Sequence, residues 1–494
     1  MSAQVAEQTS ETRQIPLLVG GKDQWASNGG TFDRVSPLSG RVASRSAAAT
    51  LEDADAAVAA AQAAFPAWAE LGPNERRSRL MRAADLMQQR STEFVDLAVD
   101  EVGGTRPWYE FNVKLASGML REAAAMTTQI TGEIIPSDVP GNMAFAMRQP
   151  CGVVLGIAPW NAPIILGTRA VAMPLACGNT VILKGSELCP GVHRLIGTVL
   201  QDAGLGDGVV NVILNARSDA SAVVERLIAN PAVRRVNFTG STNVGRMIAE
   251  TAGRYLKPAL LELGGKASVI VLDDADLDDA VQATAFGAFF NQGQICMSTE
   301  RIVVDEKVAD AFVEKLTRKA ASLAAGDADQ NRAKLGCLAS GEAGPRITSL
   351  VADAVGQGAR ILTGGKVEDT TMHPAVIDGV TKSMRLYHEE SFGPVVAIVR
   401  VKDAEEAVRV ANDTEFGLSA AVFGKDVTRA LQIAQRIHSG ICHINSSTVH
   451  DEAHMPFGGV KASGYGRFGG KAGVHEFTDI RWITLQTAHR HYPI

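Results

Sequence analysis

Cysteine and glutamate side chains that could act in one reaction occur in two separated segments. Cys296 follows an apolar stretch in the segment N-Q-G-Q-I-C-M-S, where a glycine leaves backbone room beside the sulfur, so this thiol could act as a nucleophile. A lone cysteine is, however, more often a small buried hydrophobic residue. Glu262 ends an apolar segment just before two glycines, and burial there would raise the pKa of the carboxyl and suit it to general base catalysis. The alternative is a surface acid at a strand end.

Two further segments carry groups that could bind an oxyanion and a phosphate. Asn161 follows the first strand expected in an α/β region, where such sheets present ligand-binding groups. Its amide could donate to a developing oxyanion, or the residue could simply form the turn before Pro163. Residues 237–245 indicate a strand that runs into a helix opened by glycine, with free N–H groups suited to a phosphate. A plain helix N-cap at Ser241 is the alternative there.

Two series of short β-branched runs, separated by helical stretches, must position these groups. Residues 50–131, before the first series, predict successive helices. Strands separated by helices of this length predict parallel sheets built of βαβ units, and hence two α/β domains. Strands are expected at 153–157, 180–183, 209–213, 235–238, 267–272, 301–305, 395–401, 419–423 and 441–444, and the clearest helices of the first series at 163–177 and 190–203.

Segments outside the two series predict arms and a tail. Residues 133–149 turn at Pro140-Gly141 like a hairpin, and residues 480–486 predict a late strand. Two-stranded ribbons are marginal alone, and these carry apolar side chains that a monomer would leave in water, so we expect both to pair with another subunit. Residues 1–14 are polar without an apolar run, which predicts a disordered tail and no secretory signal.

Composition excludes several classes of protein. The 494 residues include 46 % hydrophobic ones, with 48 Lys and Arg against 54 Asp and Glu, for a net charge of −6. No apolar run reaches about 18 residues, which argues against a membrane span, and both signs of charge are interspersed, which argues against nucleic acid. The six cysteines include no C-x-x-C pair, a usage typical of the cytosol. We expect a cytoplasmic protein with a small-molecule partner, no nucleic acid and no membrane contact.

Two motif matches lack the context that would make them functional. The only G-x-G-x-x-G match, Gly464 to Gly469, leaves too little chain after it for a βαβ unit. His450 and His454 are four residues apart, but the motif is not H-E-x-x-H and a Pro-Phe-Gly-Gly loop follows it. We therefore expect loop histidines and no metal site.

Together and in this order, the segments resemble the aldehyde dehydrogenase superfamily, from about Leu17 to Ile494. The resemblance implies an α/β fold with a Rossmann-like cofactor domain, an α/β catalytic domain and a small β oligomerisation arm. Gly185, where proline is commoner, and Phe468, where an acid usually follows G-R, depart from the pattern without touching the reacting groups. The motifs are P-W-N, G-N-T-V-I-L-K-x-S-E, F-T-G-S-x-x-x-G, L-E-L-G-G-K, G-Q-x-C, E-E-x-F-G-P and P-F-G-G-x-K-x-S-G-x-G-R.

The resemblance also implies domain boundaries and an assembly. The dinucleotide-binding domain would comprise residues 15–132 and 152–263, and the catalytic domain residues 264–461. The oligomerisation arm would comprise residues 133–151 and 472–494. A homodimer or homotetramer is implied.

Site roles follow from the same resemblance. Cys296 would be the nucleophile and Glu262 the base, and Asn161 would form the oxyanion hole with the Cys296 backbone N–H. The cofactor would be NAD, because Glu187 would repel a 2′-phosphate, although Lys184 could pair with one and keeps NADP as the alternative. Lys184 and Glu187 would hold the adenine-side ribose, Ser241 and Trp160 the pyrophosphate, and Glu390 with Phe392 the nicotinamide end. The remaining cofactor-binding candidates are Ile157, Pro159, Gly240, Gly245 and Leu263.

The chemistry of these groups is coherent without the family name. Addition of the thiolate to an aldehyde makes a tetrahedral alkoxide, which can give up hydride to a nicotinamide and leave a thioester on Cys296. Water then releases the carboxylic acid with help from Glu262. Because a free thiol has a pKa of about 8.5, Glu262, the positive cofactor ring or nearby N–H dipoles must activate the sulfur at pH 7.

The aldehyde is expected to be aromatic. The chain is similar to bacterial aromatic aldehyde dehydrogenases of the salicylaldehyde, benzaldehyde and vanillin type at residues 293–301, 445–452 and 464–470. Five apolar side chains could form the walls of a slot for the ring. They are Trp108, Phe111, Ile295, Met297 and Val449. For Trp108 and Phe111, ordinary helix packing is the alternative.

Two other functions stay open. An aliphatic or semialdehyde dehydrogenase would want a cation for a distal carboxylate, and no arginine lies beside Cys296 in the sequence. An inactive binding protein with this fold would have no physical need to keep Cys296, Glu262 and Asn161 together.

Overall fold

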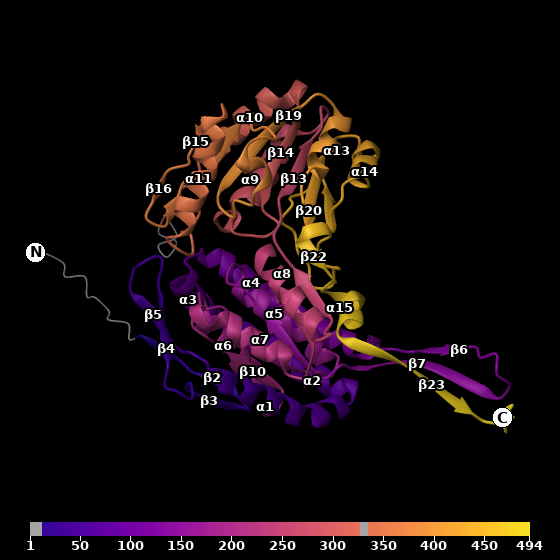
Figure 1. The fold of residues 1–494 in the computed structure, drawn as a ribbon. Coiled ribbons are helices and arrows are strands. Elements are labelled where there is room, and N and C mark those ends of the chain that lie inside the picture. Colours follow the sequence, from indigo (N-terminus) through magenta and orange to yellow (C-terminus); the bar gives the residue numbers. More distant parts are fainter. Residues whose placement is uncertain (1–11, 327–333) are drawn as a thin grey trace, which may run out of the picture.

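The computed structural model describes residues 12–326 and 334–494, which form two α/β lobes and a projecting β arm (Figure 1). The first lobe contains an eight-stranded sheet in the order β22-β12-β11-β8-β9-β10-β2-β3. Its five central strands are parallel, and its edges are antiparallel. The strands are β2 (Leu17–Val19), β3 (Lys22–Gln24), β8 (Val153–Ile157), β9 (Thr180–Lys184), β10 (Val210–Ile213), β11 (Val233–Thr239), β12 (Ala259–Glu262) and β22 (Gly464–Tyr465).

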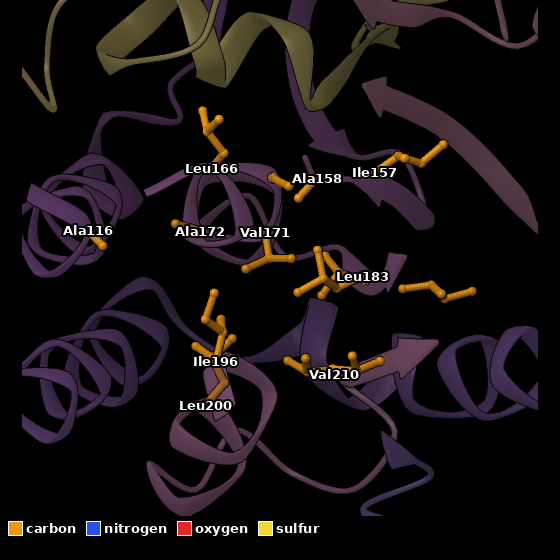
Figure 2. Packing of buried hydrophobic residues seen from close by; sticks show 14 of the residues in the cluster. Ala116, Ile157, Ala158, Leu166, Val171, Ala172, Leu183, Ile196, Leu200 and Val210 are labelled. Carbon is orange, nitrogen blue, oxygen red and sulfur yellow. The ribbon is translucent and has the colours of Figure 1, made fainter. Parts of the chain in front are cut away.

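Helices of the first lobe begin where the sequence offers caps and prolines. Thr50 and Asp53 form a capping box at the start of α1, and prolines open α2, α5 and α6, where a missing N–H costs nothing. Val171 of α5, Leu183 of β9 and Ile196 of α6 contribute to the largest buried cluster (Figure 2). The helices are α1 (Leu51–Glu70), α2 (Pro73–Gln89), α3 (Ser91–Val102), α4 (Arg106–Met126), α5 (Pro163–Ala176), α6 (Pro190–Asp202), α7 (Ala220–Ala229), α8 (Thr242–Arg254) and α15 (Gly470–Glu476).

The second lobe contains a seven-stranded sheet in the order β15-β18-β19-β14-β13-β20-β21, in which only the edge strand β15 runs antiparallel. Its strands are β13 (Ala267–Val271), β14 (Thr299–Asp305), β15 (Arg360–Thr363), β18 (Ala375–Asp378), β19 (Val395–Val401), β20 (Ser419–Phe423) and β21 (Ile441–Ile444), with a small ribbon of β16 (Val367–Glu368) and β17 (Thr371–Met372). Its helices are α9 (Leu277–Phe289), α10 (Glu306–Ala321), α11 (Ala343–Gly356), α12 (Arg385–His388), α13 (Ala404–Asn412) and α14 (Val427–Ala434).

The arm differs from the expectation in its pairing. We expected the hairpin and the late strand each to pair with another subunit, but β7 (Asn142–Pro150) and β23 (Thr478–Gln486) pair with each other along their whole length. β6 (Glu133–Ile135) adds a third strand on the other side of β7. The chain enters β23 from the short helix α15. Residues 472–476, which the sequence prediction assigned to the arm, belong to that helix. Ile134 and Trp482 stay about three-quarters exposed, at 75 % and 74 %.

The N-terminal prediction needs a correction at its boundary. Residues 1–11 of the expected tail lie outside the described residues, whereas β1 (Arg13–Ile15) pairs in parallel with β5 (Val42–Ala47). β4 (Thr31–Val35) completes this three-stranded sheet, and Arg13 forms an ion pair with Asp100. Long-range pairing of this kind leaves no local periodic signal.

The segment with the G-x-G-x-x-G match lies at a sheet edge. Gly464 begins the edge strand β22, which runs antiparallel to β12. A 3₁₀ turn, and not the parallel strand that a dinucleotide-binding loop follows, directly precedes this glycine. Within the described ranges, no helix is long and apolar enough to cross a membrane.

Candidate active site

The loop that carries Cys296 is held in an unusual backbone conformation. Directly after α9, Asn291 and Gln292 have φ values of 46° and 57°, and Gly293 follows with 69°. A left-handed conformation costs roughly 1–2 kcal/mol per non-glycine residue. A Cβ on Gly293 would lie 2.2 Å from the carbonyl oxygen of Gly393, so only glycine fits there. Such a turn persists only where its surroundings fix it.

Two glutamine side chains fix this turn to a neighbouring segment. The Gln292 amide donates to the Cys337 carbonyl oxygen (3.0 Å) and accepts from the Gly336 N–H (2.8 Å). The Gln294 side-chain oxygen accepts from the Ala339 N–H (3.0 Å). These contacts span more than forty residues of chain, which is why the sequence analysis missed them. They hold the turn that leads to Cys296 against residues 336–339.

Asn161 is fastened to the same loop. The side-chain nitrogen of Asn161 donates to the Gln294 main-chain oxygen (3.0 Å). The main-chain oxygen of Asn161 accepts from the Asn291 side-chain amide (3.0 Å) and from the Trp108 indole (3.3 Å). A primary amide carries two N–H donors, so one remains available to a ligand. Asn161 and Cys296 line the same cavity, of about 410 Å³. The side chain can therefore donate to an oxygen bound beside the sulfur.

Glu262 lies at the end of β12 and is completely buried. Apart from the Cys296 thiol, whose hydrogen bond lowers the pKa of this carboxyl, its oxygens have no hydrogen-bond partner among the described residues. Burial raises the pKa of this carboxyl to about 8, the Arg169 charge and the Cys296 thiol lower it, and the Asp451 charge raises it. The carboxyl thus has the ionisation range of a general base that works near neutral pH.

The Cys296 thiol is partly exposed, yet its pKa is raised well above the ordinary value. Burial is the main cause, and the negative charges of Glu262 and Glu390 add to it. Both effects favour the neutral thiol over the thiolate. A positive charge or a base must act on it before it can serve as a nucleophile.

A second cavity, of about 490 Å³, adjoins the first, and the two share Trp160, Gly240 and Ser241. The Lys184 side chain, which is buried in its wall, has no hydrogen bond or ion pair with a described residue. Ser241 caps α8 through the Val244 N–H (3.4 Å), so the N-cap alternative holds for its hydroxyl, while the helix N-terminus faces the shared space. The exposed side chains of Val244 and Met247 form an apolar part of the wall of this cavity. This lining fits a dinucleotide, with an anion-binding helix end and an apolar slot for a base.

Most predicted cofactor-binding residues line these cavities, and Gly245 does not. A Cβ on Gly245 would lie 2.3 Å from the Leu263 side chain, so this glycine permits α8 to pack closely against Leu263. Leu263 itself lines the smaller cavity. The predicted cofactor residues found in one or both linings are Ile157, Pro159, Trp160, Lys184, Glu187, Gly240, Ser241, Leu263, Glu390 and Phe392.

A buried ion pair positions the last two of these residues. Lys266 and Glu300 are paired at 2.5 Å with almost no exposure, and Glu300 accepts the N–H groups of Ser391 (2.8 Å) and Phe392 (2.9 Å). Phe392 has a φ of 46°, and its ring meets Trp160 edge-on at 5.7 Å. Lys266 ends the motif L-E-L-G-G-K, which by itself indicates no partner for it, and nothing local distinguishes Glu300 as a buried acid in a strand.

Glu390 itself accepts the Gly265 N–H (2.9 Å), and burial raises the pKa of its carboxyl to about 7. Arg346, which the sequence analysis also missed, lines the same cavity and donates to the main-chain oxygens of Glu390 and Ser391. Its position on α11, far along the chain from every motif, left no signal.

Aromatic rings gather beside the nucleophile loop. Trp108 and Phe111 stack at 5.8 Å, Phe290 meets Trp108 edge-on at 5.0 Å, and Phe286 stacks on Phe290 at 4.7 Å. Trp108 is buried while Phe111 is 41 % exposed, so the cluster reaches the surface. The sequence analysis missed Phe286 and Phe290, although the run A-F-G-A-F-F before Cys296 was a usable signal.

The other three candidates for a substrate slot are less informative. Ile295 and Met297 flank Cys296 in the sequence and are buried, and Val449 packs partly buried against the same hydrophobic cluster. None of the five predicted slot residues is among the described residues that line the two cavities above.

The histidine pair lies in a loop. His450 contacts Glu452 at 2.9 Å, and His454 lies 3.8 Å from the same carboxylate. Among residues 12–326 and 334–494, no group of three or more His, Cys, Asp or Glu side chains is arranged to hold a metal ion.

Comparison with known proteins decides the family. The model of the aldehyde dehydrogenase family matches residues 25–483. The chain belongs to this family. It is 66 % identical over 480 residues to a vanillin dehydrogenase of Pseudomonas fluorescens, across 97 % of this chain and 99 % of that protein. It is 46 % identical to a salicylaldehyde dehydrogenase of Pseudomonas putida, across 94 % and 96 %.

Solved structures agree with this assignment. A crystal structure of a salicylaldehyde dehydrogenase from Pseudomonas putida G7 complexed with salicylaldehyde matches with a TM-score of 0.96 at 44 % identity, across 98 % of this chain and 100 % of that one. The predicted family and α/β fold class are confirmed, and this aldehyde dehydrogenase is an aldehyde oxidoreductase that uses NAD or NADP and acts on small aldehydes.

Replacing Asn161 tests the oxyanion geometry. In this aldehyde dehydrogenase, Asn161→Ala should lower turnover by about 10² to 10³, equivalent to about 2.7–4 kcal/mol, because one preorganised donor is lost. Cofactor affinity should hardly change. Turnover and cofactor binding are measured on the same folded sample, and a rate within a few-fold of the parent would remove Asn161 from the mechanism.

Proposed function

We propose that this aldehyde dehydrogenase oxidises an aromatic aldehyde to its carboxylic acid with NAD as the preferred cofactor. The observation that carries the proposal is the hydrogen bond from the Trp108 indole to the Asn161 main chain, which joins an aromatic cluster to the oxyanion donor. The cluster also adjoins the nucleophile loop, because Phe290, which meets the Trp108 ring, begins the turn that leads to Cys296. Relatives named for vanillin, salicylaldehyde and benzaldehyde support the same substrate class.

Cys296, Asn161 and Glu262 divide the chemistry between them. The Cys296 thiolate adds to the aldehyde carbon, and the resulting oxyanion is stabilised by the Asn161 amide and the Cys296 backbone N–H. A nicotinamide cofactor held here would supply the hydride acceptor, and loss of hydride from the tetrahedral adduct would leave a thioester on the Cys296 sulfur. Water then attacks the thioester, Glu262 takes a proton from that water, and the thiolate leaves as the carboxylic acid forms.

The cofactor is proposed to extend across both cavities. Lys184 and Glu187 would bind the adenine-side ribose, Ser241 and Trp160 the pyrophosphate, and Glu390 with Phe392 the nicotinamide end. Residues 15–132 and 152–263 would thereby act as the dinucleotide-binding domain, and residues 264–461 as the catalytic domain. NAD is favoured over NADP because Glu187 lines the ribose end of the cavity, where a 2′-phosphate would meet its negative charge.

The alternative of an aliphatic semialdehyde substrate needs a cation for its second carboxylate. Arg346 donates to two main-chain oxygens, and Arg169 is paired with Asp451. Arg467, whose charge also acts on Glu262, likewise donates to two main-chain oxygens. These arginines are thus engaged within the chain, which supports the aromatic substrate. The intact geometry of Cys296 and Asn161 supports an enzyme over an inactive binding protein.

An aldehyde panel with each cofactor tests this proposal. Benzaldehyde, salicylaldehyde and vanillin should reduce NAD with higher kcat/KM than hexanal or succinic semialdehyde, as followed by nicotinamide absorbance. Efficiency should be lower with NADP, and Glu187→Gln should shift the balance toward NADP because a repelling charge is removed. Higher efficiency with succinic semialdehyde, or equal use of both cofactors by the parent enzyme, would contradict the respective part of the proposal.

We also propose a homodimer or homotetramer in the cytoplasm, assembled through the arm. The exposed apolar side chains of β6 and β23 are the support, since a second copy would remove them from water. Sedimentation at micromolar concentration should give a dimer or tetramer, and Trp482→Asp should weaken the assembly while the exposed position leaves the fold intact. A monomeric parent protein would contradict this proposal.

A further inference from the structure

Three hydrogen bonds join Asn161, Asn291 and Gln294 in a closed ring. The Asn161 side chain donates to the Gln294 main-chain oxygen (3.0 Å), and the Asn291 side chain donates to the Asn161 main-chain oxygen (3.0 Å). The Asn291 side-chain nitrogen also reaches the Gln294 main-chain oxygen, at 3.5 Å. Because every acceptor in this ring is an oxygen, both asparagine side chains must turn their nitrogen toward it. The ring therefore determines how the Asn161 amide is oriented.

The backbone of Asn291 suits it to this place as well as its amide does. Its φ of 46° and ψ of 39° lie in the left-handed region, which asparagine adopts more readily than most other residues with a side chain. The side chain is buried, and a Cβ on Gly104 would lie 3.0 Å from its Oδ1 atom, so the amide has little room to turn. Asn291 is therefore a rigid support for its hydrogen-bond partners.

Asn291 lies behind the oxyanion donor and not beside the ligand. Among the described residues that line the cavity next to Cys296, Asn161 is present and Asn291 is not. The Asn161 main-chain oxygen has a second donor, the Trp108 indole of α4, at 3.3 Å. One donor thus comes from α4 and the closer one from the nucleophile loop, which ties the position of Asn161 to the loop that carries the sulfur.

We propose that Asn291 is a positioning residue that orients the Asn161 amide so that its second N–H points at the oxyanion formed beside Cys296. One N–H of the Asn161 amide is held by Gln294, so a rotation of this side chain would turn the other N–H away from the ligand. This inference rests on the proposed function, in which Asn161 donates to the oxyanion. Asn291 acts through Asn161 and not on the reacting atoms.

A residue that acts through the Asn161 amide should have no effect once that amide is gone. Asn291→Gly removes the supporting donor but keeps the left-handed backbone, because glycine adopts this conformation freely. It should slow formation of the acyl-enzyme about tenfold, which is part of the loss expected when a preorganised oxyanion donor is removed. In an Asn161→Ala background, the same substitution should change the rate by less than about twofold, because the two residues belong to one hydrogen-bond network.

The experiment compares two reactions of the Cys296 sulfur in the enzyme without cofactor. The sulfur attacks 4-nitrophenyl acetate at its carbonyl carbon, so an oxyanion forms before 4-nitrophenolate leaves and an acetyl thioester remains. It attacks iodoacetamide at a saturated carbon, so iodide leaves and no oxyanion forms. Asn291→Gly should slow the burst of 4-nitrophenolate, whereas alkylation by iodoacetamide, followed by mass spectrometry, should keep the parent rate.

Asn112→Ala is the matched control. Asn112 is also buried, and its amide nitrogen donates to a main-chain oxygen, that of Trp108, at 2.9 Å, but it is not part of the ring around Asn161. This variant should leave both reactions near the parent rate. Asn291→Asp keeps the shape of the side chain and replaces the donor by an oxygen, so its burst should also be slow, which tests the donor even when Asn291→Gly does not fold.

Three results would overturn the proposal. Asn291→Gly could slow alkylation as much as the burst, which would mean that Asn291 holds the sulfur and not the donor. The burst could keep the parent rate in Asn291→Gly while Asn161→Ala is slow, or the slowing could persist undiminished in the Asn161→Ala background. If Asn161→Ala itself keeps the parent rate, Asn161 is not the oxyanion donor, and that part of the proposed function fails as well.

Discussion

A carboxyl buried at the end of β12 is the constraint on which the rest of this site depends. Glu262 is completely enclosed, and the desolvation of a carboxylate costs several kcal/mol where no partner compensates it. The pKa of the group consequently lies about where a neutral-pH base needs it. The same enclosure raises the pKa of the Cys296 thiol, so burial favours the neutral forms of both the nucleophile and the base.

Such a site works only if its geometry is fixed by its surroundings. The turn through Asn291 and Gln292 stays left-handed because glutamine side chains tie the nucleophile loop to residues 336–339. On the cofactor side, the Lys266–Glu300 pair holds the main chain at Phe392 in a similarly unfavourable conformation. Strain at both places is offset by buried hydrogen bonds, a distribution typical of preorganised sites.

Local patterns predicted the parts of this molecule that depend on nearby residues. The strands at 395–401, 419–423 and 441–444 have the expected bounds, because each is a short, largely apolar run that alternates with a helix, as in a parallel sheet. Asn161 and Cys296 were found through their motifs, and they line one cavity. The pairing of β1 with β5 and the contacts of Arg346 with Glu390 and Ser391 depend on distant residues that a local pattern does not contain.

The charged residues around Glu262 could not be predicted from the sequence for the same reason. Arg169 and Asp451 are 282 positions apart, and neither stands in a motif that marks it as charged and buried. The arm shows the opposite error, since its apolar strands were recognised but their first partner is the same chain. A hydrophobic pattern identifies a surface that must be covered, and only the fold identifies what covers it.

The central claim is that Glu262 serves hydrolysis of a thioester on Cys296 and is dispensable for hydride transfer. Rapid mixing of Glu262→Gln with an aromatic aldehyde and NAD, followed by mass spectrometry, tests it most directly. The account predicts one equivalent of reduced cofactor per site, then a stall, with an acyl adduct on Cys296. A missing burst would place Glu262 in the deprotonation of the thiol, and steady turnover without an adduct would contradict the account outright.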